Sequence, residues 1–245
     1  MDRADARAVG VADGTAACVP RLRVIRRGAG LVAGHAGLAA LCGQGPWRPF
    51  PPWPLSHHVA PMDQHWRSIL GEIGGLLEQA RPAEVEHAHR LMLRAPRVFA
   101  FATGRSGFVL RTFVMRLNHL GQPAFFVGDA SCPPVGPGDI FLVVSGSGST
   151  STTLGAAMEA ARHGAEVLAV VGSRVSPLGQ LAAAVVELPA PHKRGVAGAG
   201  NSRQTAGSLF EQACFVLLES LIHRRFVEQG GDKADALARH ANVEA

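Results

Sequence analysis

The sequence predicts an α/β fold built on a five-stranded parallel sheet. Five short segments are apolar at nearly every position, and segments with helical periodicity lie between them. A strand that is apolar throughout is covered on both faces, as in parallel sheets. Strands that alternate with helices place those helices on both sides of the sheet. The five predicted strands are 97–103, 123–127, 140–144, 166–171 and 184–188.

Two helices are predicted before the first strand. Asp63 can cap the first of them, in which apolar residues recur every three to four positions between Trp66 and Ala80. Pro82 suits the first turn of the second helix, which extends to about Arg94. Organised sequence therefore begins well before the first strand.

The remaining helices are predicted at 107–120, 150–163, 205–226 and 232–240. Gly164 suits the C-terminal cap of the second of these. The helix over 205–226 has two apolar stripes, which is wider than contact with one core requires. We therefore expect the chain to form a homo-oligomer, a tetramer or at least a dimer, partly through this helix.

The N-terminal quarter of the chain differs from the rest. Residues 1–61 lack sustained helical or strand periodicity, and the proline-rich segment 46–54 cannot form a helix. We interpret 1–61 as a disordered or non-native extension and 62–245 as the folded domain, with Met62 as its functional start. The arginine pair at 26–27, which precedes a mildly apolar stretch, leaves a twin-arginine or secretory signal as the alternative.

The composition argues against several classes of protein. With 47% hydrophobic and 18% charged residues, the chain can bury a substantial core. No apolar run reaches the roughly 18 residues of a transmembrane helix, so we expect no membrane span. The four cysteines form no CxxC pair. That pattern argues against a disulfide scaffold or a cysteine zinc site, and favours a reducing compartment, the cytoplasm.

The positive charge is concentrated outside the predicted domain. The net charge is +5, and residues 1–61 contribute +4 of it through seven Arg and three Asp. The remaining residues are almost balanced, at +1. A domain whose positive and negative charges nearly cancel lacks the excess positive charge that binds the phosphates of nucleic acid. We therefore expect no nucleic-acid partner.

Two loops rich in glycine and hydroxyl side chains follow predicted strands, at 103–107 and 145–153. Glycine lets the backbone approach a ligand, and hydroxyls with free N–H groups at a helix start bind anions. Neither loop has the lysine of a Walker A motif or the spacing of a dinucleotide fingerprint. Two such loops at strand ends favour a phosphomonoester on a small molecule. The alternative is that Ser and Thr only cap helices while Gly makes turns.

These segments resemble the sugar isomerase (SIS) domain family, and within it the 6-phospho-3-hexuloisomerases. The resemblance covers about residues 62–245 and implies a three-layer α/β/α sandwich. It rests on GRSG at 104–107, the segment 115–121, SGSGST at 145–150, GSLFE at 207–211 and the tail at 239–244.

The resemblance implies a reaction. Members of that family convert D-arabino-3-hexulose 6-phosphate to fructose 6-phosphate, after a synthase has condensed formaldehyde with ribulose 5-phosphate. It therefore implies a phosphosugar substrate, the ribulose monophosphate route of formaldehyde fixation, and functional coupling to 3-hexulose-6-phosphate synthase. The reaction moves a carbonyl from C3 to C2 through an enediol. It needs proton transfer, but no redox cofactor and no metal.

The resemblance also assigns the two loops to substrate binding. By this resemblance, the phosphate ligands would be Ser106, Ser145, Ser147 and Thr150. The residues that shape the loops would be Gly104, Arg105, Gly107 and Gly146. Arg105 would also touch the sugar.

Three side chains are candidates for proton transfer. Helical spacing places Glu211 on the same face as Cys214 and Leu218, and an apolar environment makes a carboxylate a stronger base. His119, at a helix end, is a candidate for acid–base chemistry or ring opening, although histidines there often only cap carbonyls. His240 would be a solvated tail residue by composition; the resemblance implies a role in a neighbouring subunit's site.

Two other functions remain open from the sequence. The first is a non-catalytic sugar-phosphate sensor, like the SIS half of some transcription regulators. That would need a helix-turn-helix, which residues 1–61 do not show. The second is another SIS isomerase, of the arabinose 5-phosphate or phosphoheptose type.

Overall fold

The apolar segments form one parallel sheet, as predicted, in a computed structural model that describes residues 61–191 and 202–241. The predicted extension, apart from Pro61, therefore lies outside the described residues. The order of the strands in the sheet is β2-β1-β3-β4-β5. The strands are β1 (Val98–Phe101), β2 (Ala124–Phe126), β3 (Ile140–Ser145), β4 (Glu166–Val171) and β5 (Ala184–Glu187).

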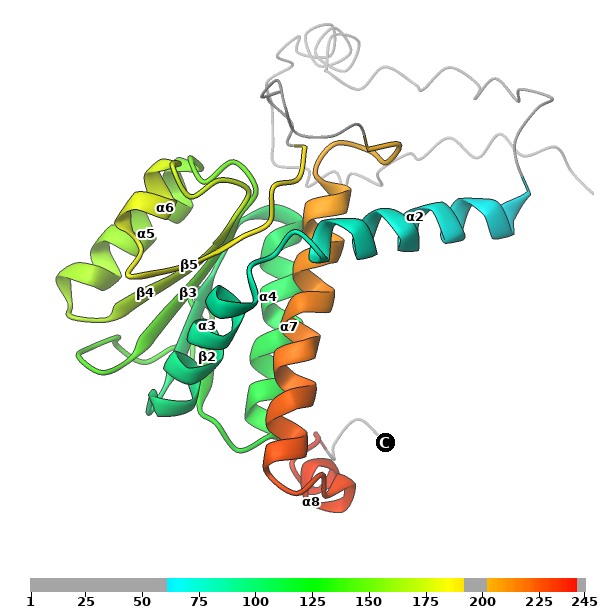
Figure 1. Cartoon of the computed structure of the whole chain (residues 1–245). Helices are drawn as coiled ribbons and strands as arrows, with labels where there is room; N and C mark the ends of the chain where they lie inside the picture. Colours follow the sequence, from blue (N-terminus) through cyan, green and yellow to red (C-terminus); the bar gives the residue numbers. More distant parts are fainter. Residues whose placement is uncertain (1–60, 192–201, 242–245) are drawn as a thin grey trace, which may run out of the picture. The chain divides into compact units, whose positions relative to one another are not determined.

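Helices cover both faces of this sheet, and the three-layer α/β/α class is confirmed (Figure 1). Alternate strand residues enter different cores. Val98 and Ala100 pack with α4 and α7, whereas Phe99 packs with α5 and α6. Within the described residues, no helix is long and apolar enough to cross a membrane. The described helices are α2 (Met62–Leu77), α3 (Pro82–Arg94), α4 (Gly104–His119), α5 (Ser151–Arg162), α6 (Pro177–Leu181), α7 (Ser208–Glu228) and α8 (Lys233–Ala238).

The strand order reverses between β1 and β3. From β1 the chain crosses through α4 to β2 on one side, and the next strand, β3, pairs with β1 on its other side. In open α/β sheets, ligands bind beyond the carboxyl ends of the strands at such a reversal. The two glycine-containing loops follow β1 and β3, so the topology brings them to this point.

The start of α4 differs from the prediction. The helix begins at Gly104 rather than Gly107, so the GRSG segment is its first turn and not a loop before it. The physical reason is a close contact. A Cβ on Gly107 would lie only 2.5 Å from the carbonyl oxygen of Ala102. Because Gly107 lacks a side chain, the helix can begin directly above the end of β1.

The cap predicted for the first helix is wrong. The N-cap of α2 is Pro61, and Asp63 lies within the first turn, where its carboxylate is 3.8 Å from Arg67. A residue inside the first turn cannot occupy the capping position, although its negative charge still favours a helix N-terminus. Pro82 does begin α3, as predicted.

An ion pair between the partly exposed Arg97 and the buried Asp139 fixes the beginnings of β1 and β3. Asp139 is almost fully buried and accepts hydrogen bonds from Nε (2.9 Å) and Nη2 (2.6 Å) of Arg97. It also accepts one from the backbone N–H of Gly136. The two strands that carry the loops are therefore aligned by side chains as well as by the sheet.

We expect Arg97→Ala to lower the free energy of unfolding by about 3 kcal/mol, because it leaves the buried Asp139 carboxylate without its cation. Urea denaturation followed by circular dichroism measures the change. Arg162→Ala is the control, because Arg162 pairs with Glu159 on the surface and should cost less than about 1 kcal/mol. Equal losses in the two variants would contradict the structural role of Asp139.

Candidate active site

A pocket of about 510 Å³ lies where the topology places a ligand, between the ends of β1 and β3 and the start of α7. The structure brings together most of the residues assigned from the sequence. Gly107 does not line the pocket; it packs closely against the backbone of Ala102. The assigned residues that line the pocket are Gly104, Arg105, Ser106, Ser145, Gly146, Ser147, Thr150 and Glu211.

The loop after β3 holds its shape through its own hydroxyls. Ser145 is buried, and its Oγ accepts a hydrogen bond from the backbone N–H of Gly148 and shares another with Oγ1 of Thr150. Ser147 Oγ accepts from the N–H of Ser149. Ser145 is therefore largely committed to the loop. Ser147 and Thr150 are only partly buried and line the pocket at the start of α5.

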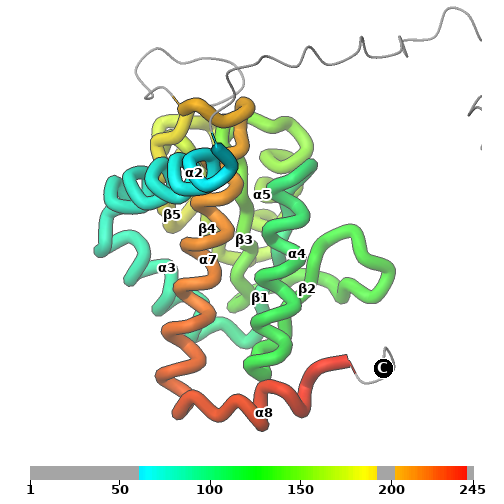
Figure 2. Tube along the Cα trace, turned by 90° about the vertical axis from the view of Figure 1, so that its right-hand side faces the viewer, coloured from blue at the N-terminus to red at the C-terminus, as the bar shows by residue number. Residues whose placement is uncertain are grey.

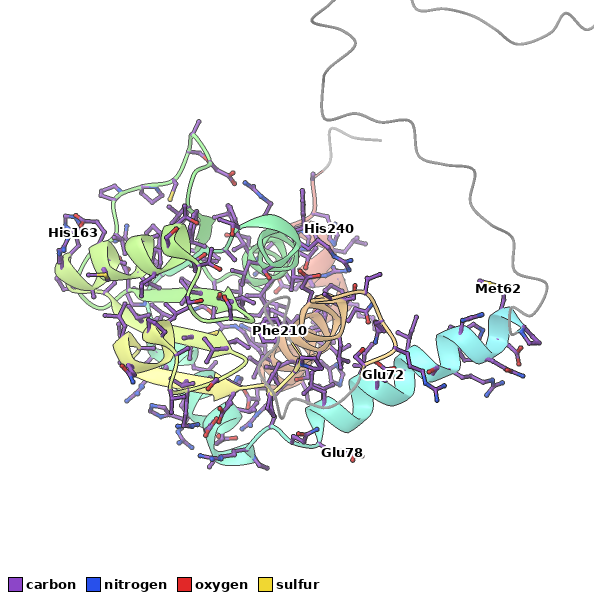
Figure 3. The ribbon with its side chains drawn as sticks, turned by 90° about the horizontal axis from the view of Figure 1, so that it is seen from above. Met62, Glu72, Glu78, His163, Phe210 and His240 are labelled. Carbon is purple, nitrogen blue, oxygen red and sulfur yellow. The ribbon has the colours of Figure 1, made fainter. Side chains whose placement is uncertain are left out.

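Two close contacts, with Phe210 and with Ser176, determine how near this loop lies to the core. Phe210 is buried inside the domain (Figure 3), and a Cβ on Gly146 would lie 3.2 Å from its ring. Gly148 has a φ of +59°, and a Cβ there would lie 1.9 Å from Oγ of Ser176. The backbone can thus approach the core only where side chains are absent. Phe210 and Gly148 were not assigned from the sequence, because their contacts come from other elements.

We expect Gly148→Ala to raise the Michaelis constant about tenfold or more, because the left-handed backbone and the contact with Ser176 would force the loop away from the ligand. Steady-state kinetics measures the effect. Gly155→Ala, in α5, is the control. A Cβ there would meet nothing within 4 Å, so the substitution should leave the Michaelis constant unchanged and add stability. An unchanged Michaelis constant in Gly148→Ala would show that the loop does not bind the substrate.

Glu211 projects from the first turn of α7 into the same pocket. Its side chain is 10% exposed, and Oε2 lies 2.8 Å from Nε of Arg105. The guanidinium of Arg105 compensates the negative charge of this buried carboxylate. One turn further along α7, burial raises the pKa of Cys214 well above its ordinary value, and Glu211 adds to that effect. The thiol of Cys214 is thus protonated and part of the core.

An acidic residue on α2 anchors the chain just before α7. The carboxylate of Glu72 accepts hydrogen bonds from Oγ of Ser202, from the backbone N–H of Arg203 and from Nε2 of Gln204. The hydrogen bond from Ser202 is the main reason why the pKa of Glu72 is lowered. Figure 3 shows Glu72 on the part of α2 nearest this segment. Because α7 starts a few residues later, α2 helps to fix the position of Glu211. No local sequence signal indicated this contact, which joins segments far apart in the chain.

Comparison with known families fits this geometry. The family model of the SIS domain matches residues 91–214, which include both loops, Glu211 and all five strands. The chain belongs to the SIS domain family. The match ends shortly after the start of α7, so most of α7 and all of α8 follow the matched residues.

Curated relatives of this SIS protein include two enzymes named 3-hexulose-6-phosphate isomerase. The one from Mycobacterium gastri is 39% identical over 72% of this chain and 88% of its own length. The one from Bacillus subtilis is 30% identical over 72% of this chain and 95% of its own length.

Solved structures share the SIS fold. A hypothetical protein from Methanococcus jannaschii has a TM-score of 0.64 and 24% identity over 74% of this chain and 99% of its own. Its crystal structure was described as inferring a molecular function of 3-hexulose-6-phosphate isomerase. The sugar isomerase domain of an RpiR transcription factor from Sphaerobacter thermophilus has a TM-score of 0.56 and 21% identity, over 72% of this chain and 94% of that one. At these identities the likeness concerns the fold alone.

His119 and His240 lie together, but away from the pocket that holds Glu211. Their rings are in contact, with centroids 3.8 Å apart and planes tilted by 30°, in a second pocket of about 320 Å³. The sixteen residues of α4 span about 24 Å, with Ser106 in the first turn and His119 in the last. Figure 2 shows α8 beside the far ends of α4 and α7. Within one chain, neither histidine can touch a ligand bound between the two loops.

The pocket that holds His119 and His240 contains more basic than acidic groups. Besides these two histidines it is lined by the basic residues Arg116 and Lys233 and by one acidic residue, Glu219. Burial lowers the pKa of His119, and the neighbouring His240 and Arg116 act in the same direction. His119 is thus neutral at physiological pH, and its buried Nδ1 has no hydrogen-bond partner among the described residues. In those same residues, no three His, Cys, Asp or Glu side chains are grouped so that they could hold a metal ion.

Proposed function

We propose that this chain is a sugar-phosphate isomerase that converts D-arabino-3-hexulose 6-phosphate to fructose 6-phosphate through an enediol. The observation that carries the proposal is the placement of a buried carboxylate, Glu211, in the same pocket as the hydroxyl-lined loop after β3. The hydroxyl-lined loop alone would bind a phosphosugar, and a base beside it can move a proton. Relatives named 3-hexulose-6-phosphate isomerase indicate which phosphosugar.

In this proposal the phosphate lies between the loops. Ser106, Ser147 and Thr150 donate hydrogen bonds to it, together with the free N–H groups at the start of α5. The sugar then extends towards α7, which brings its C2 and C3 to Glu211. Arg105 lies at the same edge of the pocket and contacts the sugar.

The chemistry divides into two proton movements. Glu211 takes the proton from C2, which leaves an enediolate across C2 and C3, and returns it to C3. The hydroxyl proton on O2 has to move to O3 in the same interval. Glu211 carries out the first movement, and a second group is needed for the other.

We infer that the second group comes from a neighbouring subunit. His119 and His240 are too far from the pocket of their own chain, yet they share a pocket with the basic residues Arg116 and Lys233. If this surface of one subunit faces the loops of another, His240 completes the neighbour's site and the positive charges attract the phosphosugar.

Exposed apolar side chains support an oligomer, and we propose a homotetramer. α2 projects from the rest of the domain, with Met62 at its far end (Figures 1 and 3). Met62, Trp66 and Leu70 recur every four residues along it and are 78%, 47% and 59% exposed. On α7, the predicted second apolar stripe is mostly used within the chain, because Leu218 and Ile222 are buried in its core, but Phe215 is 41% exposed. A monomer would leave this surface in water.

The same proposal places the chain in the cytoplasm, coupled to a 3-hexulose-6-phosphate synthase that supplies its substrate.

A coupled assay tests the proposal. The full chain is incubated with 3-hexulose 6-phosphate, arabinose 5-phosphate or sedoheptulose 7-phosphate in separate reactions, and each product is followed by its own coupling enzyme. Turnover of 3-hexulose 6-phosphate well above the other two supports the proposal. Turnover of either other sugar instead would assign another isomerase of the SIS family. Binding of 3-hexulose 6-phosphate without turnover would indicate a sensor.

A further inference from the structure

Arg105 connects the proposed base to a small network at the start of α7. Its Nε lies 2.8 Å from Oε2 of Glu211, and its Nη1 donates to Oγ of Ser208 at 3.2 Å. Ser208 Oγ in turn lies 2.8 Å from Oγ1 of Thr205. Glu211 and Ser208 are buried, whereas the side chain of Arg105 is 61% exposed. The guanidinium is thus held by buried groups at the rim of the pocket.

The network leaves part of the guanidinium free to act on a ligand. Arginine has five N–H donors in a fixed plane, and only two of its nitrogens are engaged with Glu211 and Ser208. Arg105 is also the only cation within ion-pair distance of Glu211 among residues 61–191 and 202–241. The charge of the buried carboxylate is therefore balanced by this one side chain.

Proton abstraction moves that negative charge from the protein to the substrate. The C2–H bond breaks and its proton forms a bond with a carboxylate oxygen of Glu211, which becomes neutral. The electron pair of the C–H bond becomes the C2–C3 double bond, and the π pair of the C3 carbonyl moves onto O3. The pocket then holds an oxyanion in place of a carboxylate, and its total charge is unchanged.

We propose that Arg105 is a catalytic residue that stabilises this charge as it moves from Glu211 to the enediolate oxygen. Its guanidinium pairs with the carboxylate before proton transfer and with the oxyanion afterwards, without leaving the network. Ser208 and Thr205 are positioning residues, because they hold Arg105 and do not touch the substrate. The inference rests on the proposed enediol isomerase and adds the source of electrostatic stabilisation, which is often a large part of catalysis.

The test follows exchange of the C3 proton of fructose 6-phosphate with deuterium from D₂O, measured by NMR on the full chain. This is the proton that the reverse reaction removes. We expect Arg105→Ala to lower the maximal exchange rate by about 10²–10³-fold with little change in the Michaelis constant. Guanidinium at tens of millimolar should restore at least a tenth of the lost rate. Arg105→Lys keeps the positive charge but lacks the planar guanidinium with its several donors. Its maximal exchange rate should lie between those of Arg105→Ala and the parent chain.

Arg111→Ala is the matched control. Arg111 lies on the same helix but pairs with Asp129 on the surface, so its loss should change neither the exchange rate nor the response to guanidinium. A role of Arg105 in folding alone would not be rescued by guanidinium, and circular dichroism checks that each variant is folded.

The outcomes separate the two proposals. If the parent chain shows neither exchange nor turnover of 3-hexulose 6-phosphate, the proposed function is overturned and this inference with it. If it turns the sugar over without exchange, the proton passes from C2 to C3 directly, and the same variants are compared by their turnover number. Exchange by the parent chain with an unchanged rate in Arg105→Ala overturns only the inference. An effect confined to the Michaelis constant, or a loss that guanidinium does not relieve, also overturns it, because Arg105 would then bind the sugar or support the fold without stabilising the enediolate.

Discussion

Glu211→Gln is expected to lower turnover by about 10²–10⁴-fold while binding of the phosphosugar persists. The amide keeps the volume of the side chain and one hydrogen-bonding oxygen, but it cannot accept a proton at neutral pH. The phosphate contacts come from the loops after β1 and β3, which the substitution does not touch. Steady-state kinetics should therefore show a lower turnover number at a similar Michaelis constant.

The control for this experiment is Glu159→Gln. Glu159 lies on α5, is exposed and pairs with Arg162 outside both pockets, so its turnover should match that of the parent chain. Because Glu211 is buried beside Arg105, the variant also leaves a cation without its partner, and a thermal melt separates any loss of folding from a loss of chemistry. Near-normal turnover in a folded Glu211→Gln variant would remove Glu211 as the base. The next candidate would be His119, acting from a neighbouring subunit.

The two loops that line the pocket could be predicted from the sequence because their signals are local. A buried strand, a glycine and a hydroxyl can be recognised within a few residues, and the carboxyl ends of parallel strands meet at one edge of the sheet. The loops at 103–107 and 145–153 therefore identified the pocket before any contact was known. The bounds of α4 were harder to predict, because its early start depends on how Gly107 packs against Ala102.

The pairing of side chains across the fold could not be predicted in the same way. Arg105 and Ser208 are separated by 103 positions, and no periodicity links them. The contact between Glu72 and the segment before α7 is similar in kind. The position of His119 is a different case: a helix predicted over 107–120 is already long enough to carry its last residue about 20 Å from its first. The length of this helix would have separated His119 from the phosphate loop, but His119 was still named as a candidate for proton transfer.

The separation of the histidines from Glu211 makes the site's division between subunits directly testable. His240→Ala alone should lower turnover by about 10²-fold or more if His240 moves a proton in the neighbour's site. Glu211→Gln is inactive for a different reason. The two variants can be mixed, allowed to exchange subunits, and assayed together.

Activity should return in the mixture only if sites are shared. A working site needs Glu211 from a chain of the His240→Ala variant and His240 from a chain of the Glu211→Gln variant. In an equal, random mixture each occurs with a chance of one half, so about a quarter of the parental activity is expected. As the control, Glu211→Gln is mixed with the double variant Glu211→Gln, His240→Ala, which supplies no intact Glu211 and should stay inactive. If each subunit contained its own complete site, no chain in the first mixture would be intact, and activity would stay at the level of the separate variants after subunit exchange had been verified. That result would contradict the shared site and leave His119 and His240 without a part in the reaction.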